Sequence, residues 1–219
     1  MTHTICFIDE EVESFTRNKD KFDRIGVNLC LNEYRTVETC HFKDLFSKWI
    51  KDNIPDIWIK EYKNFDTNTE IKFPVFAKNI EGRARIGCAR INSTNDYKSF
   101  LSNTNNGEGY ILQEFVTGDI VGVDIIRNRK YNQLFLVQKK ELMRNSNGCG
   151  TVVEIIDDKK LSKICRTISD KLDINGVVNA EFFMSKDGPK IIEINPRLPA
   201  GTSYSCSAGG NTVLVCTQT

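Results

Sequence analysis

Several features that would assign a protein to a functional class at sight are missing from this chain. Its 219 residues include only two histidines, and its eight cysteines form no CxxC pair, so a zinc site is not expected. The formal net charge is +1, which argues against nucleic acid or an anionic membrane as a partner. No apolar run is as long as a membrane span, and the first residues do not resemble a signal peptide. We therefore expect a cytoplasmic protein with no nucleic-acid or membrane partner.

The cysteines are scattered along the chain, and several lie in apolar stretches, as at Cys88 and Cys165. A free cysteine in such a place behaves as a small hydrophobic residue. Because no export signal is visible, we interpret the cysteines as reduced thiols, with a disulfide framework as the alternative. The composition, 40% hydrophobic and 27% charged, is ordinary for a globular protein with a sizeable core.

Residues 1–70 contain few signals apart from helices. Residues 9–22 are charged and expected to be helical, and residues 41–52 have the apolar spacing of an amphipathic helix. The apolar residues of that second helix are Phe42, Leu45, Phe46, Trp49 and Ile50. They either pack on the core of the domain that follows or form a docking surface for another domain. Because no βαβ pattern is visible, we expect residues 1–70 to be a helical segment or the remnant of a preceding domain.

From residue 73 onward, short apolar segments separated by polar and glycine-containing loops dominate the sequence. Such segments are typical of strands. Strands are expected at residues 73–78, 86–91, 110–115, 121–127, 133–139, 177–184 and 190–195, and helices at residues 95–101 and 157–172.

The most informative stretch is GVVNAEFFMSKDGPKIIEINPRLPAG, residues 176–201. It predicts two strands joined by a tight turn, because SKDG is a turn signal. Side chains alternate along a strand, so Asn179 shares a face with Glu181, and Glu193 shares a face with Asn195. The turn brings Glu181 roughly opposite Glu193, where two carboxylates and an amide oxygen suit Mg²⁺ holding a nucleotide's phosphates. The alternative is a surface hairpin with scattered charges.

The segment FPVFAKNIEGRARIG contains a strand that delivers Lys78 to a loop with Gly82, Arg83 and Arg85. Glycines let backbone N–H groups approach phosphate oxygens, and the basic side chains add positive charge. A basic turn on an ordinary hairpin is the alternative interpretation.

The segment YILQEFVTGD contains a strand that ends in the residues Gln113 to Val116. A carboxylate such as Glu114 beside backbone N–H and C=O groups can recognise the edge of adenine, with apolar neighbours covering the ring. The alternative is an edge strand with one charged residue.

A basic strand end follows, from Gln138, Lys139 and Lys140 to Arg144. It could reach a polyphosphate or an acidic substrate, or it could be a solvated basic face.

These motifs, in this order, resemble the ATP-grasp superfamily and especially its members similar to the large subunit of carbamoyl phosphate synthase. The resembling segments are FPVFAK, ILQEFVTGDIVGVDII and NAEFF…KIIEINPRLPAG…AGGN, and the EINPR block is the most specific of them. The resemblance covers about residues 71–215. It implies an α+β ATP-grasp fold in which two α+β subdomains grip ATP, with the usual N-terminal Rossmann-like domain largely absent. A lid-like subdomain would span residues 71–115, and a C-terminal subdomain with the metal site would span residues 116–219.

The resemblance also implies a role for individual residues. Lys78, at the α- and β-phosphates, and Arg197, at the γ-phosphate or an acyl phosphate, would be catalytic. The ligands of Mg²⁺ would be Glu181, Glu193 and Asn195. Further contacts to ATP would come from Arg85, Gln113, Glu114, Phe115, Val116, Asp119 and Lys139.

The implied activity is that of an ATP- and Mg²⁺-dependent ligase. Such an enzyme activates a small-molecule carboxylate as an acyl phosphate, releases ADP, and transfers the acyl group to an amine or a related nucleophile. The alternative is an ATP-binding module with little ligase activity of its own. Such a module would act with a partner domain or as a nucleotide sensor, and homo-oligomerisation would also fit.

Overall fold

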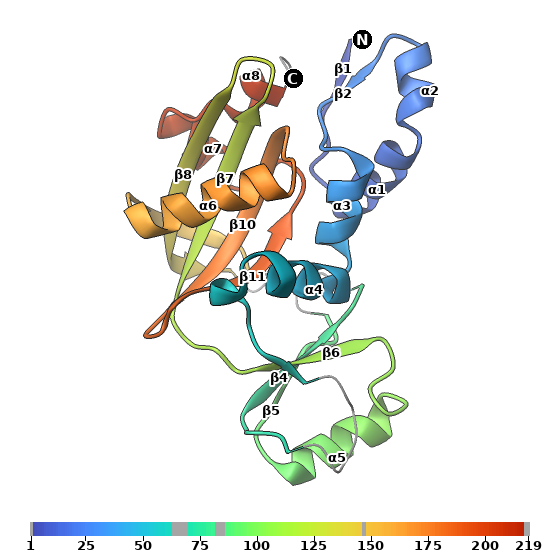
Figure 1. Ribbon diagram of the computed structural model, residues 1–219, viewed down its shortest axis with the longest axis vertical. Helices are drawn as coiled ribbons and strands as arrows, with labels where there is room; N and C mark the ends of the chain where they lie inside the picture. Colours follow the sequence, from blue (N-terminus) through green and yellow to red (C-terminus); the bar gives the residue numbers. More distant parts are fainter. Residues whose placement is uncertain (1, 63–69, 82–85, 146–147, 217–219) are drawn as a thin grey trace.

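The computed structural model describes residues 2–62, 70–81, 86–145 and 148–216. Its main elements are two antiparallel sheets, one above the other in Figure 1, with helices α3 (Tyr34–His41) and α4 (Lys43–Asn53) beside the larger sheet. The fold is therefore α+β, as the sequence predicted.

The larger sheet has the strand order β11–β10–β7–β8–β9. Its strands are β7 (Asp119–Asn128), β8 (Gln133–Arg144), β9 (Gly150–Ile156), β10 (Gly176–Ser185) and β11 (Gly188–Asn195). Helix α6 (Lys159–Lys171) covers one face, and the short helices α7 (Thr202–Ser207) and α8 (Thr212–Cys216) lie on the other (Figure 1). This division follows from alternation along the strands, because Val123 and Ile125 pack with α6 whereas Asp124 faces α7.

The smaller sheet has the order β3–β6–β4–β5. Its strands are β3 (Glu61–Tyr62), β4 (Val75–Asn79), β5 (Ala89–Ile91) and β6 (Tyr110–Glu114). Helix α5 (Thr94–Asn103) packs Tyr97 and Phe100 against Val75 and Leu112 of this sheet. Ser93 caps α5 by accepting a hydrogen bond from the backbone N–H of Asp96 at 3.2 Å, which explains where the helix begins.

Helix α4 packs on the larger sheet rather than exposing its apolar face. Phe46 and Ile50 are buried in one core with strands β7, β10 and β11 and helix α6, and Trp49 packs against that core. The docking-surface alternative for this helix therefore does not hold, although Leu45 remains 43% exposed. The predicted helix over residues 41–52 is interrupted at Phe42, which has an extended backbone and separates α3 from α4.

The N-terminal segment contains a small unit of which the sequence predicted the helical part, residues 9–22, but not the strands. Strands β1 (His3–Thr4) and β2 (Asn28–Leu29) pair in parallel, with helices α1 (Asp9–Arg17) and α2 (Lys19–Arg24) between them. The expectation that this region has no βαβ pattern was wrong, because two-residue strands are too short to give a readable alternation.

Two exclusions apply to the described part of the chain. The free cysteines there include Cys6, Cys30, Cys40 and Cys165, which are buried, and Cys88, Cys149 and Cys206. None of the helices found there is both long enough and apolar enough to cross a membrane.

The position of α4 generates a stability prediction. Ile50→Ala should lower the free energy of unfolding by about 2–5 kcal/mol, because it leaves a cavity in the core beneath the larger sheet. Leu45→Ala on the same helix is the matched control and should change stability by less than about 1 kcal/mol. Urea unfolding followed by circular dichroism measures both, and equal losses would contradict this packing of the helix.

Candidate active site

A cleft of about 1010 Å³ lies between the two sheets. It brings together most of the residues selected from the sequence. Those that line it are Lys78, Gln113, Glu114, Phe115, Val116, Glu181, Glu193, Asn195 and Arg197. Arg85 lies outside the described residues. Asp119 and Lys139 do not line the cleft.

Lys78 enters the cleft from strand β4. Val75 and Ala77 face the core under α5, so alternation sends Phe76 and Lys78 to the opposite face of the sheet. Burial lowers the pKa of Lys78, and the Glu193 carboxylate opposes that shift. The two residues come from different sheets, so the cleft places a cation of the smaller sheet under the influence of a carboxylate of the larger one.

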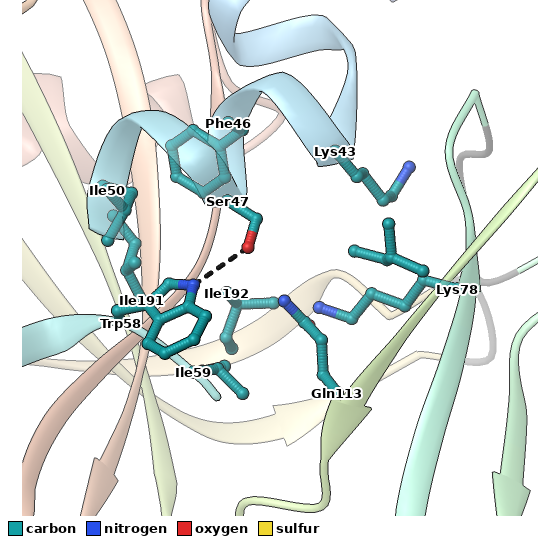
Figure 2. Close-up of a pocket in the computed structure, with 11 residues that line it drawn as sticks. Lys43, Phe46, Ser47, Ile50, Trp58, Ile59, Lys78, Gln113, Ile191 and Ile192 are labelled. Atoms are coloured by element: carbon teal, nitrogen blue, oxygen red, sulfur yellow. Dashed lines mark hydrogen bonds between the residues drawn. The ribbon is translucent and has the colours of Figure 1, made fainter. Parts of the chain in front are cut away.

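Lys43 was not selected from the sequence. It lies in the first turn of α4 and lines both the main cleft and a small cavity of about 10 Å³ that Lys78 also lines. Figure 2 shows the amine of Lys78 turned toward Gln113, whereas the amine of Lys43 points away from both. The Lys43 amine donates to the carbonyl of Ile80 at 3.5 Å. The backbone N–H of Lys43 donates to the carbonyl of Ile80 at 3.3 Å, which fixes the start of α4 against the end of β4. A lysine at the start of an amphipathic helix is too common to mark a site by itself.

The connection between β6 and β7 forms one wall of the cleft and is anchored to the smaller sheet. The backbone N–H of Glu114 donates to the carbonyl of Lys60 at 2.9 Å, and that of Phe115 donates to the carbonyl of Pro74 at 3.3 Å. Gly118 then passes close to β10, because a Cβ at this position would lie 2.4 Å from the carbonyl oxygen of Met184. This position therefore requires glycine. Phe115 was expected to contact ATP, and its backbone N–H is already used in the hydrogen bond to Pro74.

The β10–β11 hairpin has the geometry that the sequence predicted. Glu181 is the register partner of Glu193, and Asn179 is the partner of Asn195. Gly188 makes the tight turn possible with a φ of 107°, in the left-handed region that favours glycine. The side chain of Asn195 donates to Glu193 Oε1 at 3.3 Å.

The two carboxylates of this hairpin interact unfavourably. Burial raises the pKa of Glu181 to about 7, the Glu193 carboxylate adds to the rise, and Arg144 opposes it. Arg144 Nη2 lies 3.3 Å from Glu181 Oε2. Within the basic strand end, residues 138–144, Arg144 is the residue that lines the cleft. Among the described residues, no group of three histidine, cysteine, aspartate or glutamate side chains could hold a metal ion. Glu181, Glu193 and Asn195 nevertheless fit a cation such as Mg²⁺ that takes its remaining ligands from phosphates and water.

Lys139 is placed differently from the expectation. Its amine lies 2.6 Å from Asp124 Oδ2 and 3.3 Å from Ser205 Oγ, in a buried ion pair beneath α7. Asn179 completes the group by donating to Asp124 Oδ1 at 2.7 Å. Irregular register between Glu141 and Arg144 changes which face each residue occupies, and Arg144 reaches the cleft.

Asp119 is also separate from the cleft. Its exposed side chain is paired with Lys140 at 2.7 Å, whereas its neighbours Gly118 and Ile120 line the cleft. Alternation along β7 accounts for this difference, because successive side chains point to opposite faces.

Arg197 lies where the chain leaves β11. Its Nε and Nη2 pair with Asp9 Oδ1 and Oδ2 at 2.5 and 3.0 Å. Asp9 is in the first turn of α1 and also lines the cleft. No sequence pattern pointed to Asp9, because 188 residues separate it from its partner.

The raised pKa of Glu181 generates a pH prediction. Because its folded-state pKa of about 7 exceeds the ordinary value of 4.5, the stabilisation from its proton is present below 4.5 and is lost as the pH rises through about 7. Without metal, Glu181→Gln should therefore be more stable than the wild type at about pH 8 and show a smaller difference at about pH 5.

Thermal melts in a chelating buffer measure this pH dependence. Glu154→Gln, on the exposed side of edge strand β9, is the control, and its difference from the wild type should not change with pH. A constant difference for Glu181→Gln would contradict the raised pKa of Glu181.

Comparison with known proteins adds to this geometry. The profile of the ATP-grasp domain matches residues 40–201. The match begins at the end of α3 and therefore includes Lys43.

Two curated proteins are similar in sequence over part of the chain. Tyramine–L-glutamate ligase of Methanocaldococcus jannaschii is 29% identical over 94 residues, covering 42% of this chain and 30% of that protein. 3-Methyl-D-ornithine–L-lysine ligase of Methanosarcina acetivorans is 25% identical over 96 residues, covering 43% of this chain and 26% of that protein. The similarity thus spans less than a third of each relative.

A solved structure is similar over nearly the whole chain. The biotin carboxylase domain of Hydrogenobacter thermophilus 2-oxoglutarate carboxylase, in complex with MgADP and bicarbonate, has a TM-score of 0.78. The match covers 98% of this chain and 52% of the solved chain, and the two sequences are 15% identical over it. At this identity the likeness shows that the two share a fold.

Proposed function

This chain belongs to the ATP-grasp family, and we propose that it is an ATP- and Mg²⁺-dependent ligase that joins a small-molecule carboxylate to an amine through an acyl phosphate. One observation carries the proposal. Glu181 and Glu193 face each other on one side of a cleft, and Lys78 enters the same cleft from the other sheet. Cations and carboxylates arranged in this way suit the phosphates of a metal-bound nucleotide.

Lys78 and Lys43 are the candidates for binding the phosphates. Burial disfavours the charged form of Lys78, and an anionic phosphate beside it would restore the preference for that form. Lys43 lines the same cleft from α4, and its amine would add a second positive charge by turning from the carbonyl of Ile80, to which it donates at 3.5 Å. The smaller sheet with α5 would then act as a lid over the nucleotide, in agreement with the expectation for residues 71–115.

The β6–β7 connection is the candidate for binding adenine. Phe183, Ile192 and Ile194 line the cleft and provide apolar surface for the faces of the ring. The carbonyl of Pro74 already accepts a hydrogen bond from the N–H of Phe115. We therefore assign recognition of the adenine edge to the peptide groups of Val116 and to Glu114.

The metal ligands would be Glu181, Glu193 and Asn195. When bound, Mg²⁺ would relieve the repulsion between the two carboxylates and supply positive charge for phosphoryl transfer. Arg197 and Arg144 also line the cleft. Both guanidinium groups are suited to the oxygens of a transferred phosphoryl group or of the substrate carboxylate.

The proposed chemistry has two steps. A carboxylate oxygen of the acid attacks the γ-phosphorus of ATP, the bond to the bridging oxygen breaks, and an acyl phosphate and ADP form. The neutral amine then attacks the acyl carbon, the bond to the phosphate oxygen breaks, and phosphate leaves as the nitrogen loses a proton. The names of the two curated relatives, each a ligase of two amine-bearing compounds, support this substrate class.

Binding of the nucleotide is tested by its effect on stability. A ligand that binds only the folded state raises the melting temperature, so millimolar ATP with Mg²⁺ should raise it for the wild type and less for Lys78→Ala. Lys98→Ala, on the exposed side of α5, is the matched control and should behave as the wild type does. If ATP with Mg²⁺ gave no shift for the wild type, the nucleotide site would be refuted.

Identification of the products tests the chemistry. With a mixture of amino acids as acids and hydroxylamine as the amine, ATP should yield ADP, phosphate and a hydroxamate, because hydroxylamine traps the acyl phosphate. AMP and pyrophosphate would contradict the acyl-phosphate route. Nucleotide binding without turnover of any acid would instead favour an ATP-binding module.

A further inference from the structure

We propose that Asp9 is a positioning residue for Arg197, so that the first turn of α1 completes the active site. The inference rests on the proposed function, because Arg197 is assigned a role in the proposed reaction. It goes beyond the family match, since α1 lies outside the matched residues 40–201.

The contact between the two residues is a two-pronged ion pair. Arg197 Nε and Nη2 donate to Asp9 Oδ1 and Oδ2 at 2.5 and 3.0 Å. Both side chains are largely buried, with 18% of Arg197 and 25% of Asp9 exposed. A bidentate pair of this kind fixes the plane of the guanidinium group as well as its distance.

The pair determines which part of Arg197 remains for a substrate. Asp9 uses the edge formed by Nε and Nη2, while Nη1 donates to the carbonyl of Leu198 at 3.3 Å. A carbonyl is a weaker partner than an anion for a guanidinium N–H. An incoming phosphoryl or carboxylate oxygen would therefore meet Nη1 and the second N–H of Nη2 in a fixed orientation.

Arg197 also has a backbone contact to the β10–β11 hairpin, which carries the candidate metal ligands. Its backbone N–H donates to the carbonyl of Asn195 at 2.9 Å, and Asn195 is a candidate metal ligand. Asp9 thus holds a cationic group at a defined place relative to Glu193 and Asn195. Such pre-arrangement spares the reaction the loss of freedom of a long side chain.

Helix α1 does not depend on this ion pair for its place in the fold. Val12 of α1 is buried with Cys6 and Val37, and Phe15 packs against the same cluster. These contacts hold the helix against α3 independently of the charge on Asp9. A substitution that removes only the charge of Asp9 should therefore leave the fold intact, which makes the role of Asp9 testable.

The test compares Asp9→Asn, Asp9→Glu and Glu13→Gln in the full chain. Glu13 lies on the same helix and pairs with Arg17 at 2.8 Å, away from the cleft, so its variant is the matched control. With amino acids and hydroxylamine as probes, Asp9→Asn should lower kcat by about tenfold to a hundredfold. Melting temperature and binding of ATP should stay close to those of the wild type. Asp9→Glu should recover part of the lost kcat.

A double variant separates positioning from an independent role. If Asp9 acts only through Arg197, Asp9→Asn combined with Arg197→Lys should lose no more kcat than Arg197→Lys alone. Losses that multiply would overturn the inference. An unchanged kcat in Asp9→Asn, or an equal loss in Glu13→Gln, would overturn it as well.

A readout without turnover distinguishes this inference from the proposed function. In ¹⁵N NMR spectra, the Nε–H of Arg197, assigned by its loss in Arg197→Lys, should exchange slowly in the wild type and rapidly in Asp9→Asn. A wild type that turned over no probe would refute the proposed function. The exchange rate would still decide whether Asp9 holds the guanidinium group, and equal rates in the two proteins would overturn the inference.

Discussion

The repulsion between Glu181 and Glu193 is the constraint on which the rest of this structure depends. The hairpin register places the two carboxylates opposite each other, and burial raises the pKa of Glu181 to about 7. Two partly buried carboxylates repel each other unless a proton or a cation lies with them, and Arg144, 3.3 Å from Glu181 Oε2, only partly offsets the rise in the pKa of Glu181. A carboxyl group with a strongly raised pKa in a cleft is typical of a binding or catalytic site.

The elements around the hairpin hold that strained pair in place. On one side, the β10–β11 sheet packs Phe182, Ile191 and Ile194 into the main core with α4 and α6. On the other, Asn179 donates to Asp124, which Lys139 and Ser205 also contact. This buried group fixes the strand two residues before Glu181. Lys139, expected in the site itself, therefore supports it from beneath.

The part of the site encoded by local patterns could be predicted from the sequence, and the part made by tertiary contacts could not. Strand alternation and a turn signal predicted that Glu181 faces Glu193, and the structure confirms it. The pairing of Asp9 with Arg197 depends on the packing of α1, which no local pattern encodes. Arg144 could not be selected over Lys139 either. An irregular register after Glu141 in β8 brings Arg144 to the cleft, and a buried ion pair with Asp124 keeps Lys139 from it.

The central claim is that the facing carboxylates bind a divalent cation together with the nucleotide. The most direct measurement is a titration of Mn²⁺, as a substitute for Mg²⁺, followed by the electron paramagnetic resonance signal of the free ion in the presence of ATP and the protein. The account predicts that the wild type removes Mn²⁺ from solution beyond what ATP alone binds, and that Glu193→Gln loses this excess whereas Glu154→Gln keeps it. Equal Mn²⁺ binding by the wild type and Glu193→Gln would contradict the account.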